Sequence, residues 1–583
     1  MAQHALTAPT PPSFSRTTRD ARLAELDDTS FDLLVIGAGI TGAGIARDAA
    51  MRGLRVAMVD KGDLASGTSS ASSKLVHGGL RYLEHRQFGL VFESVSERAR
   101  LGELAPHLVR PLPFFFPVYR KRPRPVWQIA LGLSIYEALA LYRVPKRHQT
   151  LRGARAREAF PTMNPDGFDG GVVFWDCATD DARLTLATAR AAHDAGAWVL
   201  PYTEVVEFVV HRARVGGAVV RDRFTGASHT LSARVVVNAT GPWTDRTLGL
   251  RRQRSRLLRP TKGVHIVLPA DRLPLGATIT IPREDEHFVF AIPSGERVLV
   301  GTTDTDYDGD YDSVQATAEE VRSLLAALNG AFPGAHLGPD DVVGSWGGLR
   351  PLISPHGDHV DPMAVSREHH LVEDEDGLIT IAGGKLTTYR LMSAEVVDRV
   401  AKRLREDGMH VGRCPTAAVR LPGGDGIRWE GDALVTTGPG GRDADAELVE
   451  RYGPDTARHL RQAHGGRWLD VVGRAAREPA LGERIVPDLP YLWAEIDHAV
   501  HEELAVTLED MLRRRTQIQI RARDQGASVA EAVAERMGGL LGWSDADRQA
   551  QLDHWAGCVA AQESWRADWS DADEHDGQQE ADG

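Results

Sequence analysis

Short apolar runs alternate with segments of helical periodicity along the chain as far as residue 424. Two runs, 31–36 and 54–59, are continuous enough to be buried strands. Further short runs rich in β-branched or aromatic residues lie at 172–175, 205–210, 234–238, 265–268, 288–292 and 298–300. Apolar residues at helical spacing are clearest at 184–195, 317–328 and 391–404. This interleaving predicts an α/β fold, in which a doubly wound, Rossmann-like nucleotide domain is interleaved with a mixed-sheet substrate domain.

A different pattern follows residue 424. Apolar residues recur every four positions with charged residues between them, at Ile496, Val500, Leu504, Leu508 and Leu512. This spacing predicts one long helix with a single apolar face, and therefore a helical C-terminal domain. The first residues hold Pro, Thr, Ala and charges, without an apolar core of signal-peptide length. The expected division is a disordered leader at 1–30, the interleaved nucleotide and substrate domain at 31–424, the helical domain at 425–565 and a disordered acidic tail at 566–583.

Composition narrows the class of protein. With 42% hydrophobic and 26% charged residues, the 583-residue chain is typical of a globular protein with more than one core. Its formal charge of −13 argues against nucleic acid as a partner. Cys177, Cys414 and Cys558 lie far apart without metal-ligand spacing, which indicates reduced thiols and a cytoplasmic protein.

A glycine-rich turn joins the first two predicted strands. Gly37, Gly39 and Gly42 follow the run 31–36, and Asp60 ends the next strand, 23 residues after Gly37. Glycines at this spacing let backbone N–H groups approach a pyrophosphate at a helix N-terminus, while the acidic residue is placed to bind an adenosine ribose. The order of strand, turn, helix and strand indicates a dinucleotide-binding βαβ unit.

Two later strand ends also carry small residues. The run 235–241 ends with Ala239 and Gly241, and Gly383 and Gly384 follow another apolar run. Small residues let backbone pass close to a planar cofactor, and a glycine turn before a helix offers free N–H groups. A buried strand end without a ligand would explain either feature alone. Together with the N-terminal turn, they predict a flavin.

Seven segments carry a resemblance to a known family. They are 32–48, 67–84, 237–243, 262–267, 301–304, 348–352 and 383–390. In this order they closely resemble the FAD-dependent glycerol-3-phosphate dehydrogenases, aerobic and quinone-linked members of the D-amino-acid-oxidase-like flavoprotein superfamily. The first segment is shared by many flavoproteins, whereas the later ones are specific to this group. The resemblance implies FAD and oxidation of sn-glycerol 3-phosphate to dihydroxyacetone phosphate by hydride transfer from C2 to flavin N5, with electrons passed to quinone.

The same resemblance implies three sets of site residues. The cofactor-binding set is Gly37, Gly39, Gly42, Asp60, Lys61, Thr68, Ser69, Ser73, His77, Gly78, Ala239, Gly241, Gly383, Gly384, Lys385, Leu386 and Thr387. The substrate-binding set is Arg81, Tyr82, Arg350, Arg367 and Lys385. Several cations are needed there because a phosphate carries up to two negative charges. The catalytic set is Arg350 and His265, our first choice for the base that takes the hydroxyl proton. His77 is the second choice, although its place beside the cofactor segment favours a flavin contact.

No metal site is expected. The Asp-rich run 304–310 imitates the start of an EF-hand loop but lacks the glutamate required at the twelfth position. The pair His501 and Glu502 lacks the second histidine of a zinc protease. His356 and His359 lie in a loop of Pro, Gly and Asp without further ligands.

The apolar segment 126–142 lies between basic clusters at 120–124 and 143–147 and follows the aromatic run 113–116. It is short for a membrane span and contains Gln128. Basic flanks beside apolar surface fit an interfacial helix on an anionic membrane surface. A buried helix of the substrate domain is the alternative. We therefore expect a cytoplasmic protein, peripheral on the inner face of the cell membrane, where it meets membrane quinone.

Three functions stay open at this stage. The first is a quinone-linked glycerol-3-phosphate dehydrogenase, and the second is a glycerol-3-phosphate oxidase that passes electrons to oxygen. The third is a non-catalytic flavin-binding assembly protein, against which the intact site residues argue. The sequence leaves the electron acceptor, the role of the C-terminal domain and the oligomeric state open, and a homodimer is one option.

Overall fold

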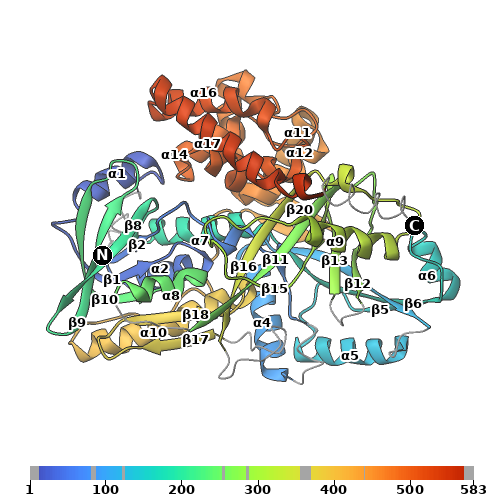
Figure 1. The fold of residues 1–583 in the computed structure, drawn as a ribbon, viewed down its shortest axis with the longest axis horizontal. Coiled ribbons are helices and arrows are strands. Elements are labelled where there is room, and N and C mark those ends of the chain that lie inside the picture. Colours follow the sequence, from blue (N-terminus) through green and yellow to red (C-terminus); the bar gives the residue numbers. More distant parts are fainter. Residues whose placement is uncertain are drawn as a thin grey trace, which may run out of the picture.

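The computed structural model describes residues 12–79, 87–120, 125–251, 257–283, 288–354, 369–438 and 440–569. Its first sheet has the order β17–β18–β10–β1–β2–β7 (Figure 1). At its centre β1 (Ser30–Ile36) runs parallel to β2 (Val56–Val59) and β10 (Ser228–Asn238). The outer strands are β7 (Trp198–Leu200), β18 (Ile379–Gly383) and β17 (His369–Glu373), and the hairpin of β8 (Thr203–His211) and β9 (Arg214–Asp222) continues from β10.

Both faces of the first sheet are covered, which explains why its strands are continuous apolar runs. Leu33 and Val35 pack into one cluster with residues of α2 (Ile40–Met51), α7 (Asp181–Asp194) and α10 (Tyr389–Glu406). Leu34 and Ile36 point to the opposite face, where Leu23 of α1 (Arg16–Ala24) joins them. Side chains of a strand alternate between faces, so one short strand serves two parts of the core.

The second sheet is mixed, and its strands come from two separate parts of the chain, β3 to β6 and β11 to β16. Its order is β15–β11–β14–β13–β12–β4–β6–β3, with β16 paired to β11 and β5 paired to β6. The strands are β3 (Leu75–Val76), β4 (Arg110–Tyr119), β5 (Gln149–Arg152), β6 (Phe168–Ala178), β11 (Leu258–Pro269), β12 (Thr278–Pro282), β13 (Phe288–Ser294), β14 (Arg297–Gly301), β15 (Thr305–Asp306) and β16 (Gly344–Ile353). Residues of α9 (Ala318–Ala331) and of α5 (Val126–Leu139) pack into two separate clusters with this sheet. The chain therefore has the predicted α/β class, with two interleaved sheet units.

The C-terminal region is helical, as predicted, after a short hairpin of β19 (Ile427–Glu430) and β20 (Ala433–Thr436). Its main helices are α11 (Gly441–Tyr452), α12 (Pro454–His464), α13 (Trp468–Arg477), α14 (Ala494–Glu502), α16 (Ala530–Leu541) and α17 (Asp545–Glu563). They have cores of their own, one around Leu460 and Val471 and one around Met511 and Val533. In Figure 1 this region lies at the top, on the opposite side of the sheets from α4 (Phe88–Leu104) and α5.

The prediction of one long C-terminal helix is wrong. All five apolar residues of the pattern are buried, but α14 ends at Glu502 and a π-helical turn covers Asp510–Arg515. Between them Leu504 has φ +55°, and its N–H donates to Phe14 O at 2.9 Å. The break turns Leu504 into the core of the first sheet, whereas the other four pack within the helical region. Periodicity identified the buried residues but not the core that each one enters.

Part of each terminus that the sequence predicts to be disordered is folded. Residues 12–15 lead into α1, and Phe14, Leu23 and Leu26 are buried against the first sheet region. At the other end Trp565 is buried in the cluster that also holds residues of α9. Few but large apolar side chains hold both segments, which composition alone does not reveal. Residues 1–11 and 570–583 lie outside the described part.

Buried ion pairs join the C-terminal region to the nucleotide domain. Asp63 is fully buried and binds Arg514 at 2.6 Å and also Arg515. Burial alone would raise the pKa of Asp63, but Arg515 and Arg514 hold it below its usual value. Arg183 of α7 pairs with Glu503 in the same way. Because an uncompensated charge there would be costly, these pairs fix how the two regions meet.

The aromatic run before α5 is a core strand rather than an interfacial segment. Phe114 and Phe115 of β4 are buried, and Phe114 stacks on Phe174 with ring centroids 5.2 Å apart. By contrast α5 itself has one buried face and one exposed face. Within the described residues, no helix has the length and apolar character needed to cross a bilayer.

Candidate active site

The glycine turn after β1 has the close contacts that its sequence predicts. Gly37 has φ +106°, and a Cβ there would lie 2.5 Å from Ala239 O. At Gly42 a Cβ would lie 1.8 Å from Gly37 O. A side chain at either position would therefore push apart β1, β10 and α2. At the N-terminus of α2, Ile40 N donates to Ser69 Oγ at 2.9 Å, which places Ser69 beside the turn.

Asp60 lies at the end of β2 and faces the same turn. Its Oδ2 accepts from Ala38 N at 2.7 Å and its Oδ1 accepts from Gly62 N at 2.9 Å. These bonds orient the carboxylate and leave lone pairs for the hydroxyls of a ribose. Burial raises the pKa of Asp60 to about 6. The glycine contacts and this carboxylate fit the adenosine diphosphate part of FAD.

The three strands before the predicted glycine segments end at one edge of the first sheet. Val237 of β10 pairs with Val35 of β1 on one side and with Ile379 of β18 on the other, all parallel. Gly241 follows β10, Gly383 is the last residue of β18 and Gly384 follows it, with φ of +55°, +75° and +87°. Segments far apart in the chain thus meet where ligands bind in open α/β sheets.

The segments around His77 and Lys385 also meet. Thr387 Oγ1 accepts from His77 N at 3.3 Å and donates to His77 O at 3.2 Å. Leu386 and Thr387 belong to the short 3-10 turn Leu386–Thr388, which Lys385 precedes. Thr68 Oγ1 donates to Leu349 O at 2.6 Å and so ties the serine-rich segment to β16.

One predicted cofactor residue has another partner. Lys61 forms an ion pair with Asp312 at 2.5 Å and lies over the ring of Trp243. Its ammonium group is therefore engaged near the surface, and its part in holding the cofactor stays a prediction.

His265 and Arg350 lie on one face of the second sheet. In the paired strands His265 is opposite Trp346, and Arg350 is opposite Thr261, so alternation places both side chains on the same face. The rings of His265 and Trp346 stack with centroids 4.7 Å apart and planes at 7°. Glycines leave the space: a Cβ at Gly263 would lie 2.5 Å from the Arg350 guanidinium, and one at Gly301 would lie 2.1 Å from the His265 ring.

His265 is a buried, neutral imidazole. Its Nε2 is 2.9 Å from Ser73 Oγ, and its buried Nδ1 has no hydrogen-bond partner in the described part of the chain. Burial, with the charges of Arg350 and Lys74, lowers the pKa of His265 to about 3. The ring can therefore accept a proton without first losing one at neutral pH.

Arg350 and Lys74 supply the positive charge near His265. Arg350 donates to Asp304 Oδ1 at 2.8 Å and to Thr302 Oγ1 at 3.1 Å. Lys74 forms a buried ion pair with Asp181 at 2.6 Å. We did not single out Asp181, Lys74 or Trp346 as site residues from the sequence. Lys74 stands inside a family segment, but its partner is 107 residues away, and no local signal links them.

Three predicted substrate residues, Arg81, Tyr82 and Arg367, lie outside the described residues, as do His356 and His359. Two aspartates of the run that imitates an EF-hand form ion pairs with arginines: Asp304 binds Arg350, and Asp306 binds Arg259. The roles of Arg81, Tyr82 and Arg367 in binding the substrate stay predictions.

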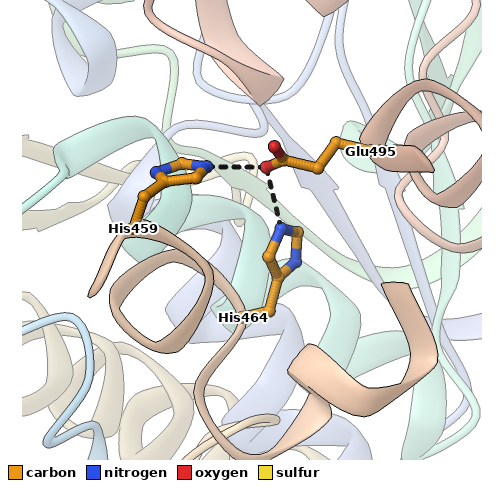
Figure 2. Close-up of side chains that lie close together, drawn as sticks. All are labelled: His459, His464 and Glu495. Atoms are coloured by element: carbon orange, nitrogen blue, oxygen red, sulfur yellow. Dashed lines mark hydrogen bonds and ion pairs between the residues drawn. The ribbon is translucent and has the colours of Figure 1, made fainter. Parts of the chain in front are cut away.

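A histidine cluster in the C-terminal region could suggest a metal. His459 Nε2 and His464 Nε2 lie 2.7 Å and 3.1 Å from the same Glu495 oxygen (Figure 2). The guanidinium of Arg183 is 3.2 Å from the other nitrogen of His464, so that nitrogen accepts a hydrogen bond. A metal on Nε2 would require Nδ1 to carry the proton and face this donor. The arrangement is better described as two hydrogen bonds to a shared carboxylate.

Comparisons with known proteins agree with this geometry. Residues 32–390 match a family described as FAD dependent oxidoreductase, and residues 414–548 match the C-terminal domain of alpha-glycerophosphate oxidase. The chain is 40% identical to glycerol-3-phosphate dehydrogenase 2 of Mycobacterium tuberculosis, over 92% of this chain and 89% of that protein. It is 35% identical to the aerobic glycerol-3-phosphate dehydrogenase of Staphylococcus saprophyticus, over 92% and 96% of the two chains.

A solved structure is similar over almost the whole chain. The glycerol-3-phosphate dehydrogenase from Bacillus halodurans, complexed with FAD, superposes with a TM-score of 0.75 and 31% identity. The similarity covers 94% of this chain and 98% of that one. FAD as the cofactor and the helical C-terminal region are thus confirmed.

The affinity for FAD should fall as the pH falls through about 6, the pKa of Asp60 in the free protein. A protonated carboxyl no longer offers two anionic acceptors to a ribose, so FAD binds the ionised form better. Asp60→Asn should bind FAD roughly tenfold more weakly near neutral pH, about the strength of one charged hydrogen bond, and lose this step in the pH profile. The dissociation constant can be followed by flavin fluorescence.

Asp306→Asn is the matched control, because this exposed carboxylate pairs with Arg259 away from the turn. The Asp306→Asn variant should keep both the wild-type affinity for FAD and the fall of that affinity near pH 6. If Asp60→Asn keeps the wild-type step, Asp60 does not contact the ribose in the way described.

Proposed function

Because this chain belongs to the FAD-dependent oxidoreductase family, we propose that it oxidises sn-glycerol 3-phosphate to dihydroxyacetone phosphate. The relatives named as glycerol-3-phosphate dehydrogenases support this substrate. The observation that carries the proposal is the shared sheet face on which Arg350 and the neutral His265 lie. An anionic alcohol needs both a cation to bind its phosphate and a base for its hydroxyl proton.

The residues divide the work between binding and proton transfer. Gly37, Gly42, Asp60 and the turns at 77–78 and 383–387 would hold FAD, which supplies a hydride acceptor when bound. His265 takes the proton from the C2 hydroxyl, and its stacking on Trp346 fixes the ring plane. Arg350, with Lys385, binds the phosphate, and Arg81, Tyr82 and Arg367 are proposed to complete this site. A phosphate beside His265 would offset the cations that lower its pKa and so strengthen the base.

Membrane quinone is the proposed electron acceptor, reached from an anionic membrane surface. The apolar residues Trp127, Leu131 and Ile135 are 60%, 54% and 41% exposed on α5. They recur every four residues and so form one stripe. Phe88 and Phe92 of the neighbouring α4 are also exposed. An exposed patch of this kind favours an apolar partner. One face of α5 is therefore suited to an interface, as the first interpretation of its sequence expects, and the other face is buried, as the second expects.

Charge near this stripe supports a membrane surface as the partner. Arg143 and Arg147 lie in the segment after α5, and Arg120 follows β4, with Lys121, Arg122 and Arg124 outside the described residues. Lys146 is less available, because it pairs with Asp432 at 2.7 Å. Cations beside an apolar stripe fit the interface of an anionic bilayer. The protein would then rest on the inner face of the cell membrane and receive quinone from the bilayer.

Arg350→Ala should lower kcat/KM for glycerol 3-phosphate by at least about a hundredfold, equivalent to roughly 3 kcal/mol from a charge-assisted contact. Glycerol should be a very poor substrate for the wild type, because it lacks the phosphate. Steady-state turnover with a soluble dye measures both. Arg272→Ala is the control, since Arg272 makes a similar pair with Asp341 on the surface. Equal turnover of glycerol and its phosphate by the wild type would contradict the assignment.

Replacing Trp127, Leu131 and Ile135 together with glutamine should move the protein from anionic liposomes to the supernatant. Turnover with a soluble dye should stay near that of the wild type, because the three side chains point away from the core. Sedimentation with liposomes measures the shift. The control variant replaces Val210, Val419 and Val449, which are exposed on other elements. If the α5 variant still sediments as the wild type does, the stripe is not the membrane contact.

A further inference from the structure

Tyr136 occupies the buried face of α5, behind the exposed stripe. It is 1% exposed, and Val91 and Val95 of α4 belong to the same small apolar cluster. In Figure 1 α4 and α5 lie next to each other below the sheets. The same short helix thus presents apolar residues to the outside and one phenol to the inside.

The hydroxyl of Tyr136 is saturated with hydrogen bonds. It donates to Asp176 Oδ2 at 2.8 Å and accepts from Gly78 N at 2.9 Å and from Arg98 at 3.2 Å. Arg98 also binds Asp176 Oδ1 at 2.6 Å. Because the single phenol proton goes to Asp176, both lone pairs face N–H donors. Burial, and then Asp176, raise the pKa of Tyr136, so it remains a donor.

Gly78 is packed directly against this hydroxyl. A Cβ at Gly78 would lie 2.2 Å from Tyr136 Oη and 2.4 Å from Val95 Cγ1. Gly78 follows His77, whose backbone exchanges hydrogen bonds with Thr387. The position of the Tyr136 hydroxyl therefore sets the position of a turn that belongs to the cofactor-binding residues.

The second flavin turn is held from the same helix pair. Arg390, which begins α10 after the turn at 383–388, binds Glu97 of α4 through two hydrogen bonds of 2.7 Å and 2.6 Å. Both residues are buried. The α4–α5 pair thus holds the first turn through Tyr136 and holds α10, directly after the second turn, through Glu97.

We propose that Tyr136 is a positioning residue of the flavin site, which fixes the turn of His77 and Gly78 through its hydroxyl. The inference rests on FAD binding at these turns, as proposed above, but not on the identity of the substrate. A purely structural brace of α5 would affect stability alone. A positioning residue also affects how tightly the chain holds FAD and how often the Gly78 amide opens.

Tyr136→Phe tests the proposal in the holoenzyme. The change keeps the ring but leaves the buried Gly78 N–H with only Asp176 Oδ2, at 3.4 Å. The dissociation constant for FAD should rise about tenfold, and hydrogen exchange in the peptide 75–79 should become about tenfold faster, as expected for one lost buried hydrogen bond. The flavin absorption spectrum should also shift, since the turn moves relative to the ring.

Tyr491→Phe is the matched control. Tyr491 is also buried, and its hydroxyl accepts from a backbone amide, Gln517 N, at 3.3 Å, but within the helical region. It should change stability without changing FAD affinity or exchange at 75–79. If both variants bind FAD as the wild type does, with equal exchange at 75–79, Tyr136 only braces α5 and the proposal is overturned. This outcome leaves the proposed substrate unaffected, because no turnover is measured.

Gly78→Ala approaches the same contact from the other side and serves if Tyr136→Phe is too unstable to purify. Its methyl group would displace the turn from the Tyr136 hydroxyl and should raise the FAD dissociation constant at least about tenfold. If Tyr136→Phe can be purified, the same change in that background should have an effect at least threefold smaller, because the effects of substitutions at residues in contact are not additive. Fully multiplicative effects, or an unchanged dissociation constant in Gly78→Ala, would overturn the proposal.

Discussion

The close approach of backbone at the carboxyl edge of the parallel sheet is the constraint on which the rest of the structure depends. A Cβ at Gly37 would collide with Ala239 O, and one at Gly42 with Gly37 O, so β1, β10 and α2 meet without side chains between them. A glycine turn of this kind lets a pyrophosphate approach the N–H groups at the helix N-terminus. Once the edge is set, Asp60 and the turn at 383–387 lie beside it.

Local signals in the sequence were sufficient for the nucleotide part of the fold. Gly42 and Asp60 contact neighbours within one βαβ unit, so their spacing predicts their geometry. The close approach of Gly37 to Ala239, by contrast, joins distant segments. In the C-terminal region local signals were not sufficient to predict the structure. Leu504 obeys the helical period, yet the chain breaks there and Leu504 enters the core of the first sheet. Periodicity reports burial, but the partner of a buried side chain depends on tertiary packing.

In the candidate site, too, the sequence predicted some residues but not the contacts between distant segments. Family segments identified His265 and Arg350, and the strand register explains why they share a face. The surroundings of His265 and of the turn at 77–78 come from distant segments: Lys74, near His265, binds Asp181, and Tyr136 binds Gly78, 58 residues away. Such pairs leave no pattern in a single sequence. The contact of Tyr136 with Gly78 also directs one face of α5 toward the turn at 77–78, while Trp127, Leu131 and Ile135 are exposed on the other.

Anaerobic reduction of the purified yellow protein tests the central claim most directly. We expect sn-glycerol 3-phosphate to bleach the flavin absorption fully within the time of one turnover, while glycerol at the same concentration leaves it unchanged. Admission of a soluble quinone should then restore the yellow colour faster than air does. A flavin that stays oxidised with glycerol 3-phosphate, or that glycerol reduces equally well, would contradict the assignment of this site.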